Sequence, residues 1–239
     1  MHDYTAILSE SGACYAERLA SDFDIMLLPR DREISEAVSS HADMLLFALG
    51  GSLVVPNAYC EENAELLETL RDRTGVELLC ERSPRGERYP NDIALNVLLC
   101  SRFAFSLARG TSREAMQLLE RHGITHVNVK QGYAACSSLA FGNALVSADV
   151  GILRAARSAG LDVLQISPGA ISLPGLSEGF IGGASGVCEN KIYFLGNIKA
   201  HPDGKRITDF ARQRGFECVS LSRDRLCDIG GIKFIRNAR

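Results

Sequence analysis

The chain has 239 residues, of which 46% are hydrophobic and 23% are charged, and its formal net charge is -3. This length allows one large domain or two small ones and is ample for a hydrophobic core, so folding requires neither disulfides nor metal ions. The near balance of 26 Lys and Arg against 29 Asp and Glu argues against a nucleic-acid scaffold, so we expect no DNA partner.

The sequence carries no sign of membrane insertion or secretion. No apolar run approaches the roughly 18–20 residues of a membrane span, and the first residues lack the basic and apolar regions of a secretion signal. The eight cysteines are scattered without a Cys-x-x-Cys pair, which disfavours zinc ribbons and thioredoxin-like sites. We therefore expect a cytoplasmic protein with no membrane partner.

The two ends of the chain predict complementary pieces of one structural unit. The N-terminal part predicts a strand over residues 4–8, a helix near residues 13–20 and a second strand over residues 23–28, with no strand before them. Residues 30–41 predict an additional helix. The C-terminal residues 229–235 predict a strand without a helix, which would supply the missing opening strand of the first unit.

Between these ends, a similar unit recurs at intervals of 45–49 residues. Its order is strand, strand, helix, glycine and strand. The residues that precede the opening strands are polar or very small: Asp43, Asp92, Ser138, Gly183 and Asp228. Helix starts are indicated by a capping box from Thr111 to Glu114, by Asp149 and by Pro202. Each helix ends at a glycine suited to a left-handed cap, at Gly75, Gly123, Gly160 or Gly215.

Two strands before most helices favour a closed ring of five ββαβ units. The alternative is an open doubly wound α/β sheet, which has about one strand for each helix. A ring would leave only short, protected strand edges. Residues 167–178, rich in Pro, Gly and Ser, predict an ordered loop and not a linker, so we expect a single domain over residues 1–239.

Several stretches resemble a known superfamily. Residues 48–57 resemble a blade strand of initiation factor six, and residues 131–136, 179–186 and 201–203 resemble an uncharacterised family of the same fold. The whole chain thus resembles the pentein (GME-type) superfamily, which includes arginine deiminases, amidinotransferases and that ribosome anti-association factor. The resemblance implies an α/β fold, a five-bladed αβ-propeller of ββαβ repeats in which the N- and C-terminal segments close one blade.

A propeller brings the starts of its inner strands to the ring axis, so three carboxylates would share one central depression: Asp43, Asp92 and Asp228. Crowded carboxylates repel one another unless a cation or hydrogen-bond donors neutralise them, and a planar amidine or guanidine offers matched N–H groups. We therefore predict an axial pocket for a nitrogen-rich small molecule. Its further ligand-binding residues are predicted to be Asn96, Ser138, Asn143 and Gly183. Alternatively, the aspartates lie at surface turns and bond local amides.

Catalytic penteins that act on guanidino compounds use a nucleophilic Cys, a His and an acidic residue. Cys136, at a predicted blade entrance, and Cys227, in the closing segment, are the candidate nucleophiles; otherwise both are structural thiols. His201 with Asp203 is the candidate acid–base pair; otherwise the two form a helix start. Residues 179–183 contain no histidine where the family carries His-x-Asp, so the standard deiminase motifs are not intact.

No cofactor and no metal site is predicted. The glycine-rich residues 182–186 lack the Lys-Ser/Thr of a phosphate-binding loop and instead suit close approach of the backbone to the axis, and no His, Cys and Asp cluster has ligand spacing. Two functions remain. The first is an amidinotransferase-like protein, possessing hydrolase or transferase chemistry on an amidine or guanidine. The alternative is a non-catalytic module that docks on the ribosome or another macromolecule.

Overall fold

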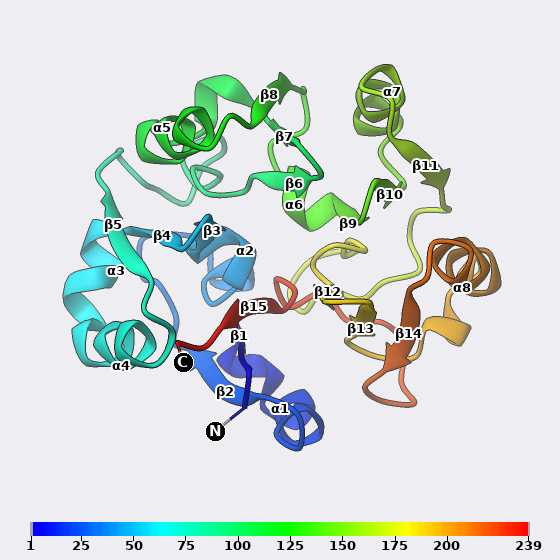
Figure 1. Cartoon of the computed structure of the whole chain (residues 1–239), viewed down its shortest axis with the longest axis horizontal. Helices are drawn as coiled ribbons and strands as arrows, with labels where there is room; N and C mark the ends of the chain where they lie inside the picture. Colours follow the sequence, from blue (N-terminus) through cyan, green and yellow to red (C-terminus); the bar gives the residue numbers. More distant parts are fainter. Residues whose placement is uncertain (1, 239) are drawn as a thin grey trace.

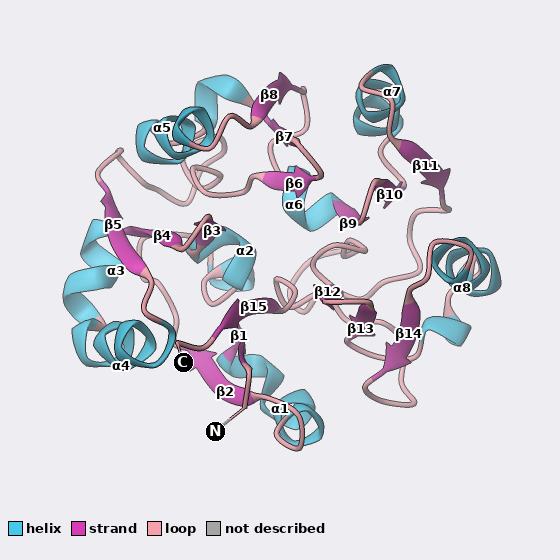
Figure 2. Ribbon diagram, in the orientation of Figure 1, coloured by secondary structure: helices cyan, strands magenta, loops and turns pink. Residues whose placement is uncertain are grey.

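The computed structural model describes residues 2–238 as five three-stranded sheets arranged around an axis (Figure 1). In each sheet the innermost strand pairs antiparallel with the middle strand, and the middle strand pairs parallel with the outer strand. Helices connect the middle and outer strands of every blade (Figure 2). The chain is therefore a five-bladed αβ-propeller of ββαβ units, as the sequence predicts.

The blades are numbered from the chain ends. The first contains β15 (Lys233–Arg236), β1 (Tyr4–Ser9), α1 (Ala13–Leu19) and β2 (Asp24–Leu28). The second contains β3 (Phe47–Leu49), β4 (Ser52–Pro56), α3 (Asn57–Glu62), α4 (Ala64–Thr74) and β5 (Glu77–Glu81). The third contains β6 (Leu98–Cys100), β7 (Phe103–Ser106), α5 (Arg113–Arg121) and β8 (Thr125–Asn128).

The fourth blade contains β9 (Ser138–Phe141), β10 (Ala144–Ser147), α7 (Val150–Ser158) and β11 (Asp162–Gln165). The fifth contains β12 (Ser185–Cys188), β13 (Lys191–Phe194), α8 (Gly204–Arg212) and β14 (Glu217–Ser220). Two short helices, α2 (Ala42–Leu45) and α6 (Ala134–Ser137), precede β3 and β9. Within residues 2–238, every helix is too short or too polar to reach across a lipid bilayer.

The two ends of the chain complete the first blade. β15 lies antiparallel to β1, with Arg236 opposite Tyr4 and Lys233 opposite Ile7. Beyond the strand, Nδ2 of Asn237 donates a hydrogen bond to the backbone oxygen of His2 over 2.8 Å. The ring closure predicted from the chain ends is confirmed.

The hydrophobic core lies between neighbouring blades. Side chains of the middle strands alternate in direction, because successive residues of a strand point to opposite faces. In β10, Leu145 packs toward the third blade, while Ala144 and Val146 pack toward the fifth. The other middle strands alternate in the same way. A middle strand is therefore buried on both faces, which explains its nearly continuous apolar sequence.

Residues 30–41 do not form the predicted helix. Only Glu36–Val38 make a short 3₁₀ turn. The carboxylate of Asp31 accepts a hydrogen bond from the backbone of Glu33 over 2.8 Å and pairs with the buried Arg85 over 3.2 Å. This pairing across the fold holds the segment in an irregular conformation despite its helical sequence pattern.

Candidate functional site

Five buried polar side chains meet at the axis, and we call them the axial cluster. They are His41, Asp43, Asn96, Cys136 and Asp228, each at most 4% exposed. His41 immediately precedes α2, Asp43 lies on α2 and Cys136 lies on α6. Asn96 and Asp228 lie on the segments that precede β6 and β15. The starts of the inner strands thus bring residues from four blades to one point, and four of these five residues are among those singled out from the sequence.

Asn96 links two of its neighbours. Its Nδ2 donates to the backbone oxygen of Asp43 over 3.2 Å and approaches Sγ of Cys136 at 2.9 Å. Its Oδ1 accepts hydrogen bonds from the backbone N–H groups of Ala135 and Cys136 at 2.7 and 3.3 Å. The first amides of a helix have no partner within the helix, so Asn96 both satisfies the start of α6 and fixes the position of the thiol.

Asp228 is held by the backbone. Its carboxylate accepts hydrogen bonds from the N–H groups of Phe180 at 2.8 Å and Gly230 at 3.0 Å. Burial and then the negative charge of Asp43 raise the pKa of Asp228 to about 7, against the two backbone donors, which lower it. Near neutral pH the protonated and ionised forms of this carboxyl group are therefore both populated.

His41 lies near Asp228, with Nδ1 of the imidazole 3.8 Å from Oδ1 of the carboxylate. Burial lowers the pKa of His41, although the nearby charge of Asp43 opposes the shift. His41 was not predicted as a site residue from the sequence. The available signal was its position two residues before Asp43, at the start of the α2 turn.

Asp43 and Cys136 are poorly neutralised. Both carboxylate oxygens of Asp43 are buried, and neither has a hydrogen-bond partner among residues 2–238. Burial, followed by the charges of Asp43 and Asp228, raises the pKa of the Cys136 thiol well above its ordinary value. The cluster thus disfavours the thiolate form of Cys136 and leaves both oxygens of Asp43 without a hydrogen-bond donor from residues 2–238.

A second acidic position adjoins the cluster. Oδ2 of Asp92 accepts a hydrogen bond from the hydroxyl of Tyr133 over 2.5 Å, and Oδ1 is buried without a partner within the described residues. Burial and the Asp92 contact raise the pKa of Tyr133, with a smaller effect from Cys136. Tyr133, which immediately precedes α6, is a second residue that the sequence analysis did not assign to the site.

Three further residues predicted to bind the ligand are not members of the axial cluster. Asn143 is exposed at the β9–β10 turn, where Nδ2 faces the backbone oxygen of Gly160 at 3.5 Å. Ser138 donates to the hydroxyl of Ser147 over 3.1 Å. Gly183 packs directly against Asp228.

His201 and Asp203 lie outside the axial cluster. Cys227 precedes Asp228 in the chain, but its side chain packs into the core between the first and fifth blades. Nδ1 of His201 accepts the backbone N–H of Asp203 over 3.0 Å, and the Asp203 carboxylate pairs with Arg206 and the backbone N–H of Ser167. These contacts are those of a turn before α8. Cys227 is half-buried, and burial raises the pKa of its thiol.

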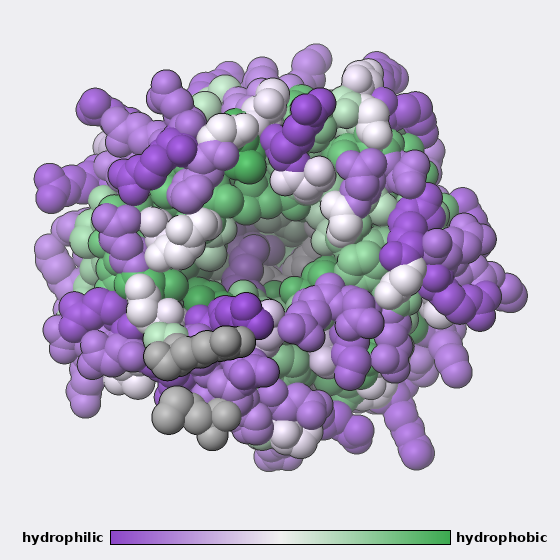
Figure 3. Space-filling view, viewed as in Figure 1, coloured by the Kyte–Doolittle hydropathy of each residue, from purple (hydrophilic) through white to green (hydrophobic). Residues whose placement is uncertain are grey.

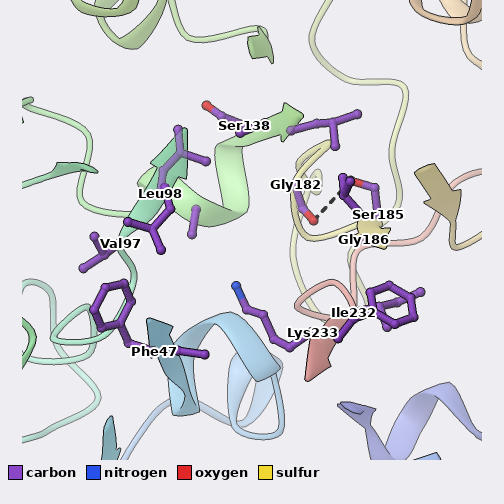
Figure 4. A pocket seen from close by; sticks show the side chains of 16 residues that line it. Phe47, Val97, Leu98, Ser138, Gly182, Ser185, Gly186, Ile232 and Lys233 are labelled. Atoms are coloured by element: carbon purple, nitrogen blue, oxygen red, sulfur yellow. Dashed lines mark hydrogen bonds between the residues drawn. The ribbon is translucent and has the colours of Figure 1, made fainter. Parts of the chain in front are cut away.

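Two cavities lie next to the axial cluster. One is lined by residues adjacent to the cluster in the chain, and the other is lined by His41 of the cluster itself. The axial cavity, of ≈ 260 Å³, lies between the inner strands and touches Ala135 and Gly182 (Figure 4). The His41 cavity, of ≈ 490 Å³, is lined by His41, Arg30 and Leu176, among others. Among residues 2–238, no three His, Cys, Asp or Glu side chains are arranged to hold a metal ion.

The fold matches solved enzyme structures over nearly its whole length. A dimethylarginine dimethylaminohydrolase in adduct with S-methyl-L-thiocitrulline matches with a TM-score of 0.59 and 11% identity, over 99% of this chain and 100% of that chain. The C. jejuni agmatine deiminase matches with a TM-score of 0.59 and 9% identity, over 100% and 95%. A Microseira wollei amidinotransferase of saxitoxin biosynthesis matches with a TM-score of 0.52 and 10% identity, over 94% and 78%.

At these identities the likeness shows the fold, which is that of the pentein superfamily. No curated protein sequence matches the chain. One family profile does match, and it covers residues 13–233. Because that match spans most of the sequence, the chain belongs to the family of unknown function DUF6873.

Proposed function

We propose that the axial cluster binds a small compound bearing an amidinium or guanidinium group. The observation that supports this most strongly is Asp43, whose two buried oxygens lack hydrogen-bond partners within the described residues. A buried charge without a partner is unfavourable, whereas a planar cation satisfies a carboxylate with two parallel N–H groups. The names of the structural neighbours, an agmatine deiminase and an amidinotransferase, agree with this ligand class.

Asp228 gives the proposed binding a defined pH dependence. Its carboxyl group has a pKa of about 7, because it is buried and lies near the charge of Asp43, so it is mostly protonated at lower pH. A bound cation would stabilise the carboxylate and displace that proton. Affinity for the cation therefore increases as the pH rises through about 7.

The proposed chemistry places Cys136 as the nucleophile. A cation bound beside Cys136 favours its thiolate by neutralising the surrounding carboxylates. Sγ then forms a bond to the central amidinium carbon, and the thiol proton passes through Asp228 or His41 to the amine that leaves as the C–N bond breaks. Water or an acceptor amine releases the product and regenerates the thiol, giving a hydrolase or a transferase respectively.

Binding is tested by calorimetric titration of acetamidinium, guanidinium and agmatine, with the neutral acetamide and urea as matched controls. We expect the cations to bind and the neutral compounds to fail, and we expect Asp43→Asn to weaken cation binding by roughly tenfold or more. Asp22→Asn, at an exposed site, should behave as the wild type. Equal affinities of the wild type and Asp43→Asn, or no heat with any cation, would rule out this site.

The nucleophile is tested by comparing alkylation by 2-chloroacetamidine and by the neutral 2-chloroacetamide. In each reaction, a sulfur–carbon bond forms and chloride leaves. We expect the cationic reagent to label Cys136 faster and Cys136→Ser to abolish that labelling, while the exposed Cys14 reacts at rates set only by the reagents' own reactivity. Labelling of Cys136 no faster than in the Asp43→Asn variant would contradict a nucleophile activated by cation binding.

A further inference from the structure

The axial cavity is walled by the inner strands of all five blades. Its volume is ≈ 260 Å³, and Figure 3 shows the ring hollowed at its centre, with hydrophobic residues around the hollow. Phe47, Val97, Leu98 and Ile232 contribute apolar surface (Figure 4). The wall of this cavity thus combines apolar side chains with polar surface.

One cation projects into this cavity. Lys233, on β15, is the only charged residue among those that line the cavity, and its side chain extends into the space between Phe47 and Gly182 (Figure 4). Within residues 2–238, no carboxylate lies within 4.0 Å of its amine. A partly buried ammonium group without an ion-pair partner is best stabilised by a negative charge.

The backbone adds hydrogen-bond donors around the same space. Each inner strand is the edge strand of its sheet, and the free edge faces the axis (Figure 2). Edge strands present N–H and C=O groups that have no partner in the sheet. The hydroxyls of Ser138 and Ser185 already donate to Ser147 and to the backbone oxygen of Ile181, at 3.1 and 2.7 Å. Lys233 is therefore the principal side-chain donor for a ligand.

The floor of the cavity separates it from the axial cluster. Gly182 and Ala135 line the floor, and the N–H of the adjacent Gly183 donates to the backbone oxygen of Cys136 over 2.9 Å. Neither Asp43 nor Asp228 lines the cavity. The two regions thus have opposite charge preferences, although they lie on the same axis.

We infer that the axial cavity is a second ligand site, which binds a small organic carboxylate through Lys233. A single ammonium group balances one negative charge, which favours a monocarboxylate over a doubly charged phosphate. Phe47, Leu98 and the other apolar side chains of the wall favour a short aliphatic group on that carboxylate, because its burial removes hydrocarbon surface from water. The volume of ≈ 260 Å³ suits a ligand smaller than a drug-sized compound.

The test is calorimetric titration with sodium butyrate, its neutral amide butyramide, and inorganic phosphate. We expect butyrate to bind at least roughly tenfold more tightly than butyramide or phosphate. Lys233→Met, which keeps the length of the side chain and removes the charge, should weaken butyrate binding by a similar factor. Lys233→Arg should retain binding, and Lys199→Met, at an exposed site, should match the wild type.

Thermal unfolding of Lys233→Met verifies that the variant folds. Butyrate affinity that is unchanged in a folded Lys233→Met variant, or absent from the wild type, would overturn the inference, as would phosphate binding more tightly than butyrate. Asp43→Asn should leave butyrate binding unchanged. This outcome separates the carboxylate site from the proposed amidinium site, so that either can fail without the other.

Discussion

The axial cluster depends on glycines that allow backbone and side chains to come unusually close. A Cβ atom built on Gly183 would lie 1.9 Å from Oδ1 of Asp228, and one built on Gly230 would lie 2.3 Å from Cβ of His41. Neither position can hold a side chain without displacing the cluster. Within the glycine-rich residues 182–186, Gly183 is therefore required by Asp228, whereas Gly182 and Gly186 face the backbone oxygens of Ala135 and Ile232.

Substituting Gly183 tests this close approach. We expect Gly183→Ala to lower the free energy of unfolding by about 1–3 kcal/mol, because the added methyl group overpacks a buried carboxylate. Gly86→Ala is the matched control, since its Cβ would have no atom nearer than Cβ of Asn91 at 3.9 Å. Urea unfolding measures both variants. Equal stability of the two would contradict the packing of Gly183 against Asp228.

The raised pKa of Asp228 predicts how stability changes with pH. Folding raises this pKa from 3.8 to about 7, so the native state binds the proton more tightly than the unfolded chain. The resulting stabilisation is fully present below pH 3.8 and is lost as the pH rises through about 7, at about 1.4 kcal/mol for each pKa unit. His41, whose pKa is lowered, acts in the opposite direction.

Asp228→Asn removes the ionising group and tests the sign of this effect. We expect the wild type to lose stability between about pH 5 and about pH 8 relative to this variant, because only the wild type has an ionisable group at position 228. Urea unfolding at both pH values provides the measurement, and the exposed Asp22→Asn serves as the control. Parallel pH dependences of Asp228→Asn and the wild type would contradict the raised pKa.

The sequence identified side chains at strand starts more readily than their partners. Asp43, Asn96 and Asp228 were predictable, because repeated units place corresponding positions around one axis. His41 and Tyr133 were not, because their roles depend on contacts between blades. Spacing along one strand cannot reveal such contacts.

At the level of elements, short-range signals located helices well and their caps less precisely. Asp149 caps α7 as predicted, with Oδ1 accepting the N–H of Ile152 over 2.8 Å. The cap of α5 is Ser112, whose Oγ accepts the N–H of Ala115 over 3.0 Å. The predicted cap, Thr111, donates instead to the hydroxyl of Ser106 over 2.7 Å. The Thr111 hydroxyl therefore bonds to β7 and does not cap the helix.

This difference predicts distinct effects of two neighbouring substitutions. Ser112→Ala should destabilise the protein by about 1 kcal/mol and should speed hydrogen exchange at the N–H of Ala115, which loses its acceptor. Thr111→Val removes the hydroxyl but keeps the size of the side chain, and it should leave hydrogen exchange at the N–H of Ala115 unchanged. Amide exchange followed by NMR distinguishes the two. Faster exchange in Thr111→Val alone would restore the sequence-based assignment of the cap.

The sequence predicts inner strands that are longer than those of the structure, and the extra residues lie next to the axial cluster. The predicted strands begin next to Asp43 and Asp228, whereas β3 begins at Phe47 and β15 at Lys233. The intervening residues form turns whose backbone groups serve the cluster, such as the N–H of Gly230 that donates to Asp228. Apolar sequence alone does not distinguish such turns from strands.

At the scale of the whole molecule, the repeat determines the architecture because each blade completes its neighbours. Four of the five core clusters join two adjacent blades. The fifth joins the first two blades and extends to Ile93 and Cys136 of the next two. A blade removed from the ring would expose both faces of its middle strand. Five units and complementary chain ends were therefore sufficient to predict the ring, whereas the contents of its centre required the structure.

The closing strand should accordingly be essential, while the position of the chain ends should not. A chain truncated after Gly231 loses β15 and with it the buried Ile232 and Ile235. We expect this chain to lose cooperative thermal unfolding, because β1 is left as an exposed edge and the ring is open.

A circular permutant tests whether folding requires closure of the ring or the natural position of the chain ends. Its original ends are joined by a short Gly/Ser linker, which is feasible because the N–H of Asn237 donates to the backbone oxygen of Asp3 over 2.9 Å. New ends between Gly175 and Leu176 fall in an exposed loop outside the strands. We expect the permutant to fold with the circular dichroism spectrum and cooperative melting of the wild type, since every blade is retained. Cooperative unfolding of the truncated chain at the wild-type temperature would show that the ring does not need β15, and failure of the permutant alone would show that folding requires the natural chain ends.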